Sequence, residues 1–312
     1  MGEASPIVVK WREAGVSGNE TGDNGGGGCC RDFRSEFSSE NLGFDRETTH
    51  GTIVDWRATF GRNLFCGRDS ALLTVAVRIC FLFAMATIWV WSQLDWRAGH
   101  HAFGYWWIYL THTTLTLQVI YHLLAVLIAF QSARDGSGGE SIPCLAKVVW
   151  LLQAVCLPST FFVFVLYWGL VFDGDLHLIS CFTHGANFAV MLLDSLCSGF
   201  PVLLAHGLYF LLYAALFLGW SAVHYALGLS NEKGQPYIYS TLDWSYPGFV
   251  AKLAFIILAV AAPLVSVVCW AGMRWRSLAF GLPGVERRWQ LRQQDESVVL
   301  DEEEGEKEVE LP

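Results

Sequence analysis

The sequence predicts an all-α polytopic membrane protein with six transmembrane helices and both termini in the cytosol. Of its 312 residues, 53 % are hydrophobic and only 16 % are charged, whereas a soluble domain is typically about a quarter charged. The mean hydropathy is +0.38, and the 14 Trp, 10 Tyr and 21 Phe suit a chain with two membrane interfaces to anchor. This composition disfavours a soluble cytosolic enzyme and a disordered chain. The net charge of −9 offers no basic surface for nucleic acid.

Six long apolar runs account for the predicted helices. A helix needs about 20 mostly apolar residues to cross a bilayer, and strands of this length are not expected. The fourth run is the least apolar, because His184, Asn187 and Asp194 interrupt it. The six runs cover residues 71–92, 104–130, 147–172, 178–197, 202–226 and 248–273.

Two polar segments flank this six-helix domain of residues 71–273. Residues 1–70 are glycine-rich and include the run Gly22–Gly28, so we expect a disordered cytosolic tail. Residues 274–312 end in the acidic run Asp301–Glu310, which predicts a solvated cytosolic tail.

The distribution of Lys and Arg predicts the topology, because cytosolic loops carry more of them. The loops at 93–103, 173–177 and 227–247 contain few basic residues and are expected to face the lumen or the exterior. The opposite helix ends carry Arg57, Arg62, Arg68, Arg134, Lys147, Arg274, Arg276, Arg287 and Arg288. Both termini should therefore be cytosolic, with the protein in the endoplasmic reticulum or the plasma membrane.

Polar residues at helical spacing form stripes in two of the predicted spans. Ionisable and polar groups are costly in lipid, so such stripes are expected to face the interior of the bundle. The second span carries Thr111, Thr114, Gln118 and His122, and the fourth carries His184, Asn187, Met191 and Asp194.

The depths of Thr111, His184 and His224 coincide in the predicted topology. Thr111 and His184 each lie about 10 Å from the outer end of their spans, and His224 closes the fifth span at that end. A hydroxyl and an imidazole at equal depth could form a nucleophile and its base. The alternative is structural, because a threonine in a membrane often bonds its own backbone or packs helices together.

Four further residues are candidates to support this pair or to line its cavity: Asn187, Asp194, His224 and Gln118. Asn187, one turn from His184, is the expected oxyanion donor. Asp194 lies about 15 Å along the helix from His184, so a Ser-His-Asp type of contact is not expected. Asp194 could equally serve only in helix packing.

The sequence predicts no metal site and no cofactor. The nine Cys are scattered without a CxxC pair, and His100-His101 lack the partners of a membrane di-iron site. His206 and His224 lie about 27 Å apart on one helix, which leaves a two-haem electron carrier as a remote alternative. Arg78, near the inner end of the first span, is expected to extend toward the membrane surface.

Four strings carry a resemblance to a known family: YLTHTTLTLQ (109–118), LYWGLVF (166–172), THGANFAVMLLD (183–194) and GLSNEKGQPYIYSTLDWSYPG (228–248). They resemble the rolling-stone family of multi-pass membrane proteins. That family is distantly similar to the androgen-induced membrane hydrolases, which cleave fatty-acid esters of hydroxy fatty acids with a Thr and a His. The resemblance implies that Thr111, after Tyr109-Leu110, and His184, ten residues before Asp194, carry these roles. Two positions depart from the hydrolases, which have His where Cys181 stands and Thr where Gly185 stands.

Two functions therefore compete. One is a Thr/His hydrolase of lipid esters, with a membrane lipid such as a fatty-acyl ester as its partner. The other is a non-catalytic membrane protein that acts through its outer loop in adhesion, fusion or signalling. Residues 230–247 are rich in Tyr and Trp and could form either a lid or a contact surface. The hydrolase interpretation predicts that Thr111 and His184 face one cavity in the outer half of the membrane, lined by apolar and aromatic side chains.

Overall fold

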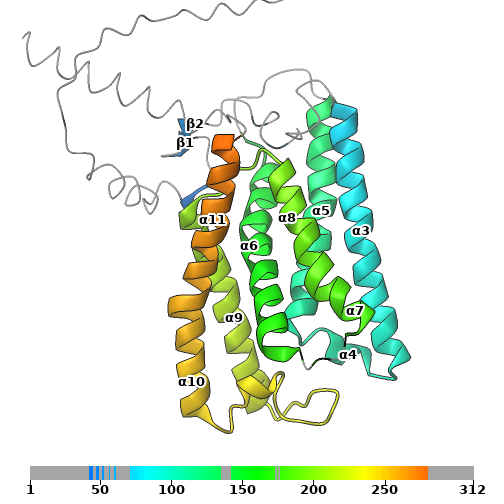
Figure 1. Ribbon diagram of the computed structural model, residues 1–312, viewed down its shortest axis with the longest axis vertical. Helices are drawn as coiled ribbons and strands as arrows, with labels where there is room; N and C mark the ends of the chain where they lie inside the picture. Colours follow the sequence, from blue (N-terminus) through cyan, green and yellow to red (C-terminus); the bar gives the residue numbers. More distant parts are fainter. Residues whose placement is uncertain are drawn as a thin grey trace, which may run out of the picture.

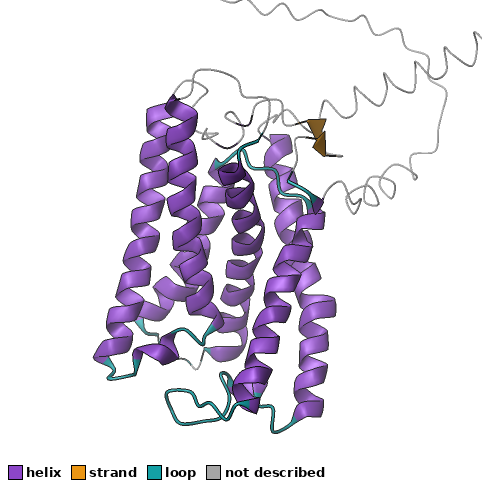
Figure 2. Ribbon diagram, turned by 180° about the vertical axis from the view of Figure 1, so that it is seen from behind, coloured by secondary structure: helices purple, strands orange, loops and turns teal. Residues whose placement is uncertain are grey.

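Long helices packed side by side make up almost all of the described structure (Figure 1). The structure is a computed structural model that describes residues 42–44, 47–48, 51–52, 56, 60, 71–134, 142–172, 174 and 176–279. Its α-helices are α3 (Ala71–Ala98), α4 (Phe103–Trp106), α5 (Leu110–Arg134), α6 (Cys144–Leu166), α7 (Leu178–Ser180), α8 (Asn187–Cys197), α9 (Gly207–Ala226), α10 (Pro247–Ile256) and α11 (Ala262–Ala279). Figure 2 shows the same helical bundle from behind.

Several helices contain or adjoin shorter helical turns. The π-helical turns are η2 (Tyr167–Val171), η3 (Cys181–Ala186) and η6 (Ile257–Ala261), and the 3-10 turns are η4 (Leu204–His206) and η5 (Ser240–Leu242). Two short strands, β1 (Glu47–Thr48) and β2 (Gly51–Thr52), pair antiparallel with Glu47 opposite Thr52. Apart from this short strand pair, the described elements are all helical.

Five helical segments of the described chain have the length and apolar composition of membrane spans: Ala71–Ala98, Leu110–Arg134, Cys144–Val171, Leu204–Ala226 and Pro247–Ser277. Their outer surfaces are apolar. Leu72, Phe83 and Phe255 are exposed at 83 %, 74 % and 69 %. An exposed apolar surface of this extent suits lipid rather than water. The chain is an integral membrane protein.

The predicted count of six spans is not confirmed. The segment 178–197 is helical, but it consists of α7, η3 and α8, and it is not one of the five candidate spans. His184, Asn187 and Asp194 lower its mean hydropathy. The segment still belongs to the bundle, because α8 packs against α6 and α3.

The loops predicted to share one side of the membrane do gather at one end of the bundle. The segments 99–109, 176–177 and 227–246 lie together at the bottom of Figure 1. We call this the outer end, after the predicted topology. The compartment that it faces stays a prediction, as does the cytosolic location of the termini.

Short stretches of the predicted N-terminal tail pack at the opposite, inner end. Phe60 is fully buried and its ring contacts Trp150 and Phe200, with centroids at 5.7 Å and 4.9 Å. Trp56 belongs to the same apolar cluster. Most of residues 1–70, for which disorder was expected, lie outside the described residues. The acidic run at the end of the second tail also lies outside them. The last helix continues to Ala279, past the predicted end at 273.

A buried ion pair joins the first helix to α8. Arg78 Nη1 contacts Asp194 Oδ1, and the Tyr121 hydroxyl donates to Asp194 Oδ2 at 2.6 Å. Arg78 is only 3 % exposed and Asp194 only 1 %. The expectation that Arg78 extends toward the membrane surface is therefore wrong, because a carboxylate 116 residues away neutralises it inside the bundle.

A second arginine holds the end of α8. Arg276 on α11 donates to the carbonyl oxygens of Ser195 at 2.5 Å, Ser198 at 2.7 Å and Phe200 at 2.9 Å. A helix C-terminus leaves carbonyl groups without intrahelical partners. A cation at this end also interacts favourably with the negative end of the helix dipole. The two arginines thus fix the inner part of the helical run that carries His184.

Candidate functional site

A large cavity opens at the outer end of the bundle. Its volume is about 890 Å³, within the range of small-molecule sites. The start of α5, the end of α6 with η2, the segment 177–184, part of α9 and the loop 231–242 form its walls. Thr111 and His184 both line it.

Thr111 occupies the first turn of α5. Its side chain is nearly buried, with 8 % exposure. The backbone N–H of the preceding residue, Leu110, donates to the hydroxyl of Tyr239 at 3.2 Å. Because the first N–H groups of a helix have no partners within it, a hydroxyl at this position satisfies one of them. The outer loop is thereby attached to the turn that carries Thr111.

His184 is held by stacking between two π-helical turns. Its ring lies parallel to that of Tyr167, with centroids 3.6 Å apart and an interplanar angle of 5°. Tyr167 begins η2 and His184 belongs to η3. Single π-helical turns often occur at functional sites. Among the described residues, no hydrogen-bond partner reaches the buried His184 Nδ1.

The two elements that carry Thr111 and His184 are in contact, since α5 packs against η3. The structure therefore brings the two residues selected by depth to the wall of one cavity. His112, next to Thr111, lines the same cavity and is close enough to His184 to affect its electrostatic environment.

The other four sequence candidates are not among the described residues that line this cavity. Asn187 donates from Nδ2 to the carbonyl of Thr183 at 3.0 Å, and Asp194 is paired with Arg78. Gln118 is fully buried in α5. His224 is buried near the end of α9, where it interacts with the backbone of Ser230 and so supports the start of the outer loop.

The outer loop is folded over the cavity. Asn231 Oδ1 accepts from the backbone N–H groups of Lys233 and Gln235, both at 2.9 Å. Gly234, with φ of +73°, completes this turn in a conformation that favours glycine. Trp244 Nε1 donates to Ser221 Oγ at 3.1 Å, which ties the loop back to α9.

Sequence reasoning missed several polar residues of the cavity wall. The Tyr109 hydroxyl donates to Glu232 Oε2, and burial together with this bond raises the pKa of Tyr109. His112 Nδ1 lies 2.7 Å from the carbonyl oxygen of Trp106, and its ring stacks on the Trp106 ring at 4.4 Å. His112 could have been predicted to line the cavity, because it is next to Thr111 in the sequence. The sequence did not indicate that Glu232 and Tyr239 line the cavity, because only the fold brings their loop to α5.

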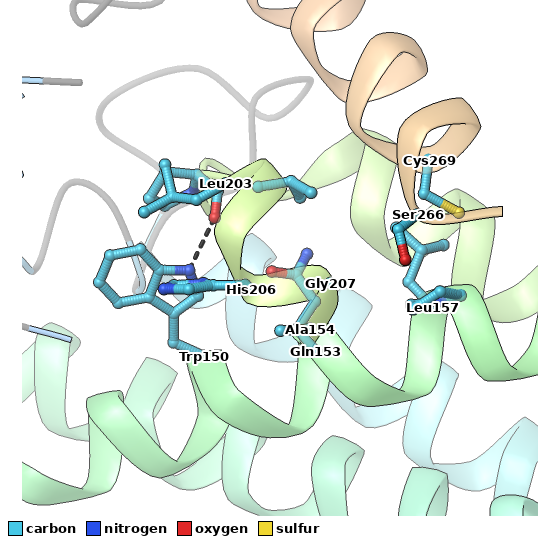
Figure 3. Close-up of a pocket in the computed structure, with 12 residues that line it drawn as sticks. Trp150, Gln153, Ala154, Leu157, Leu203, His206, Gly207, Ser266 and Cys269 are labelled. Carbon is cyan, nitrogen blue, oxygen red and sulfur yellow. Dashed lines mark hydrogen bonds between the residues drawn. The ribbon is translucent and has the colours of Figure 1, made fainter. Parts of the chain in front are cut away.

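A second pocket lies at the inner end, between α6, η4 and α11 (Figure 3). His206, Gln153 and Ser266 line it, and Trp150 Nε1 donates to the carbonyl oxygen of Pro201 at 2.7 Å. Its volume of about 20 Å³ has room for little more than one water molecule. It is too small for a lipid.

Comparison with known proteins places the chain in a family. A family model described as FAR-17a/AIG1-like protein matches residues 72–269, about two thirds of the chain. The chain belongs to the FAR-17a/AIG1-like family. The matched region includes Thr111, His184 and the outer loop of this family member.

A curated relative supports the rolling-stone resemblance. The protein rolling stone of Drosophila melanogaster is 30 % identical over 107 residues, which are 32 % of this chain and 38 % of the relative. The matched part is thus well under half of the relative's length. The prediction of a rolling-stone-like membrane protein is confirmed. No solved structure matches the chain.

Proposed function

We propose that this protein is an intramembrane hydrolase of fatty-acid esters of hydroxy fatty acids, with Thr111 as nucleophile and His184 as base. One observation supports this above the others: both side chains line the same cavity of about 890 Å³. A hydroxyl and an imidazole in the wall of one cavity supply the minimum chemistry for acyl transfer, because a threonine needs a base to remove its proton.

The reaction runs in two steps. His184 accepts the Thr111 hydroxyl proton while Thr111 Oγ forms a bond to the ester carbonyl carbon, and the carbonyl electrons move onto oxygen. When the carbonyl re-forms, the bond to the hydroxy acid breaks, and its alkoxide takes the proton from His184. A water molecule then attacks the acyl-threonine with His184 again as base, which releases the fatty acid and restores Thr111.

The walls of the cavity suit an ester with an acyl chain. Phe162, Leu166 and Phe217 provide apolar surface, while Glu232 and Lys233 bring charged groups to the loop side. Lipid-binding sites combine an apolar lining with a few polar groups that set orientation. The acyl chain would occupy the apolar part, and the ester would lie near Thr111.

The test combines hydrolysis and labelling of the full-length protein in nanodiscs. A fluorophosphonate probe, which traps activated hydroxyls, should label the wild type but not Thr111→Ala. Ester cleavage should fall to background in both Thr111→Ala and His184→Ala, with unchanged expression and membrane insertion. Thr116→Ala is the matched control, because that hydroxyl lies on the same helix and bonds Trp89 and the His112 carbonyl instead.

Labelling that persists in Thr111→Ala would refute the assignment of the nucleophile. Wild-type protein that neither reacts with the probe nor cleaves the ester would refute the hydrolase. That result would favour the alternative, a non-catalytic protein that acts through its outer loop in adhesion, fusion or signalling.

A further inference from the structure

Tyr239 brings a phenol from the outer loop directly to the turn that carries Thr111. It lines the cavity, 128 residues from Thr111 in the sequence. Its hydroxyl oxygen accepts the Leu110 N–H at 3.2 Å and also interacts with the backbone and side chain of Thr111. A second bond, from the Tyr109 hydroxyl to Glu232, ties the same loop to the residue before α5.

These contacts restrict where the phenol proton can point. A phenol oxygen accepts through its lone pairs and donates through a single O–H. The Leu110 N–H and the Thr111 groups occupy the acceptor side of the phenol oxygen, so its O–H is left to donate into the cavity. An ester carbonyl under attack by Thr111 Oγ would place its oxygen within reach of that donor.

We propose that Tyr239 is the oxyanion donor of the reaction: its hydroxyl hydrogen-bonds the ester carbonyl oxygen and stabilises the negative charge formed when Thr111 attacks. This inference rests on the hydrolase function proposed above. It replaces the expectation that Asn187 has this role, because the Asn187 amide donates to the Thr183 carbonyl and is not part of the cavity wall.

The surroundings of Tyr239 suit a fixed donor. Its ring packs edge-to-face on Tyr109 with centroids 5.5 Å apart, and it contacts Phe217 at 6.2 Å. Burial raises the pKa of Tyr239 to about 12, against the opposing effect of the hydrogen bonds from Leu110 and Thr111. The phenol therefore keeps its proton throughout the neutral range. A donor that is already oriented stabilises a transition state without reorganisation.

The experiment compares Tyr239→Phe with Tyr246→Phe. Both changes remove one hydroxyl from the outer loop and keep the ring, but Tyr246 is 68 % exposed and is not among the described residues that line the cavity. Full-length protein in nanodiscs is assayed with a long-chain fatty-acid ester of a hydroxy fatty acid, and kcat and KM are measured separately. Loss of one oxyanion donor costs about 100- to 1,000-fold in kcat. We expect that loss in Tyr239→Phe, a KM within about threefold of wild type, and near-normal kinetics in Tyr246→Phe.

Binding of a non-cleavable ether analogue of the ester separates chemistry from folding and positioning. Unchanged analogue affinity in Tyr239→Phe, together with the loss of kcat, supports the oxyanion role. Wild-type kcat in Tyr239→Phe would overturn it, and so would a loss of analogue binding as large as the loss of kcat. In both cases, the hydrolase proposal would still hold if the wild type is active and is labelled at Thr111. An inactive and unlabelled wild type would remove both proposals.

Discussion

Replacement of Asp194 by alanine should strongly destabilise the bundle through Arg78. Asp194 neutralises Arg78 and accepts the Tyr121 hydroxyl bond at 2.6 Å, and both members of the ion pair are almost completely buried. Removal of one partner from a buried pair leaves an uncompensated charge, which costs about 3–5 kcal/mol. We expect a loss of that size in the free energy of unfolding for Asp194→Ala.

Equilibrium unfolding in mixed detergent micelles measures this change. Asp95→Ala is the matched control, because Asp95 is exposed at the end of α3 and should change the stability by less than about 0.5 kcal/mol. The double variant Arg78→Met/Asp194→Asn removes both charges and keeps an acceptor for Tyr121, so it should regain most of the loss. An Asp194→Ala variant within about 1 kcal/mol of wild type would refute the reasoning.

Three further predictions address other parts of the fold. Arg276→Ala should lower the free energy of unfolding by at least about 2 kcal/mol, because it removes three charge-assisted bonds at the end of α8; wild-type stability would contradict this. Gly207→Ala should cost about 1–3 kcal/mol, since its new Cβ would lie 2.8 Å from the Ser266 side chain, and Ser266→Gly should relieve the strain. Protease added to the cytosolic side of sealed vesicles should remove both tails, and protection of either tail would contradict the predicted topology.

Much of the membrane architecture could be predicted because lipid imposes simple rules on a helix. Apolar length locates the spans, and the grouping of segments 99–109, 176–177 and 227–246 at one end follows from the alternation of helix directions. The span predicted at 178–197 is not confirmed, because this helical segment is not among the five candidate spans of the described chain. A helix that buries polar residues against its neighbours loses the apolar composition by which a span is recognised.

The candidate pair could be predicted for a related reason. Depth in a membrane is nearly proportional to position along a helix, so residues far apart in sequence, such as Thr111 and His184, can be compared on one axis. Polar stripes then indicate which side of each helix faces inward. Depth and orientation together allow two side chains to be predicted in one cavity, without knowledge of which helices are neighbours.

The partners of Asp194 and Thr111 could not be found in this way, because each depends on which helices and loops are neighbours. Asp194 shared the stripe of His184, and that pattern made it a candidate to support the Thr/His pair or to pack helices. A charge in lipid is neutralised by whichever opposite charge the packing brings closest. That charge is Arg78 on α3. Tyr239 lies outside every span, where depth and helical spacing give no information. Its place at the start of α5 follows from the turn at Asn231 and the bond from Trp244 to Ser221, which direct the loop inward over the cavity. The residue that would complete the proposed chemistry is thus supplied by a loop outside the candidate spans, where the rules for membrane helices do not apply.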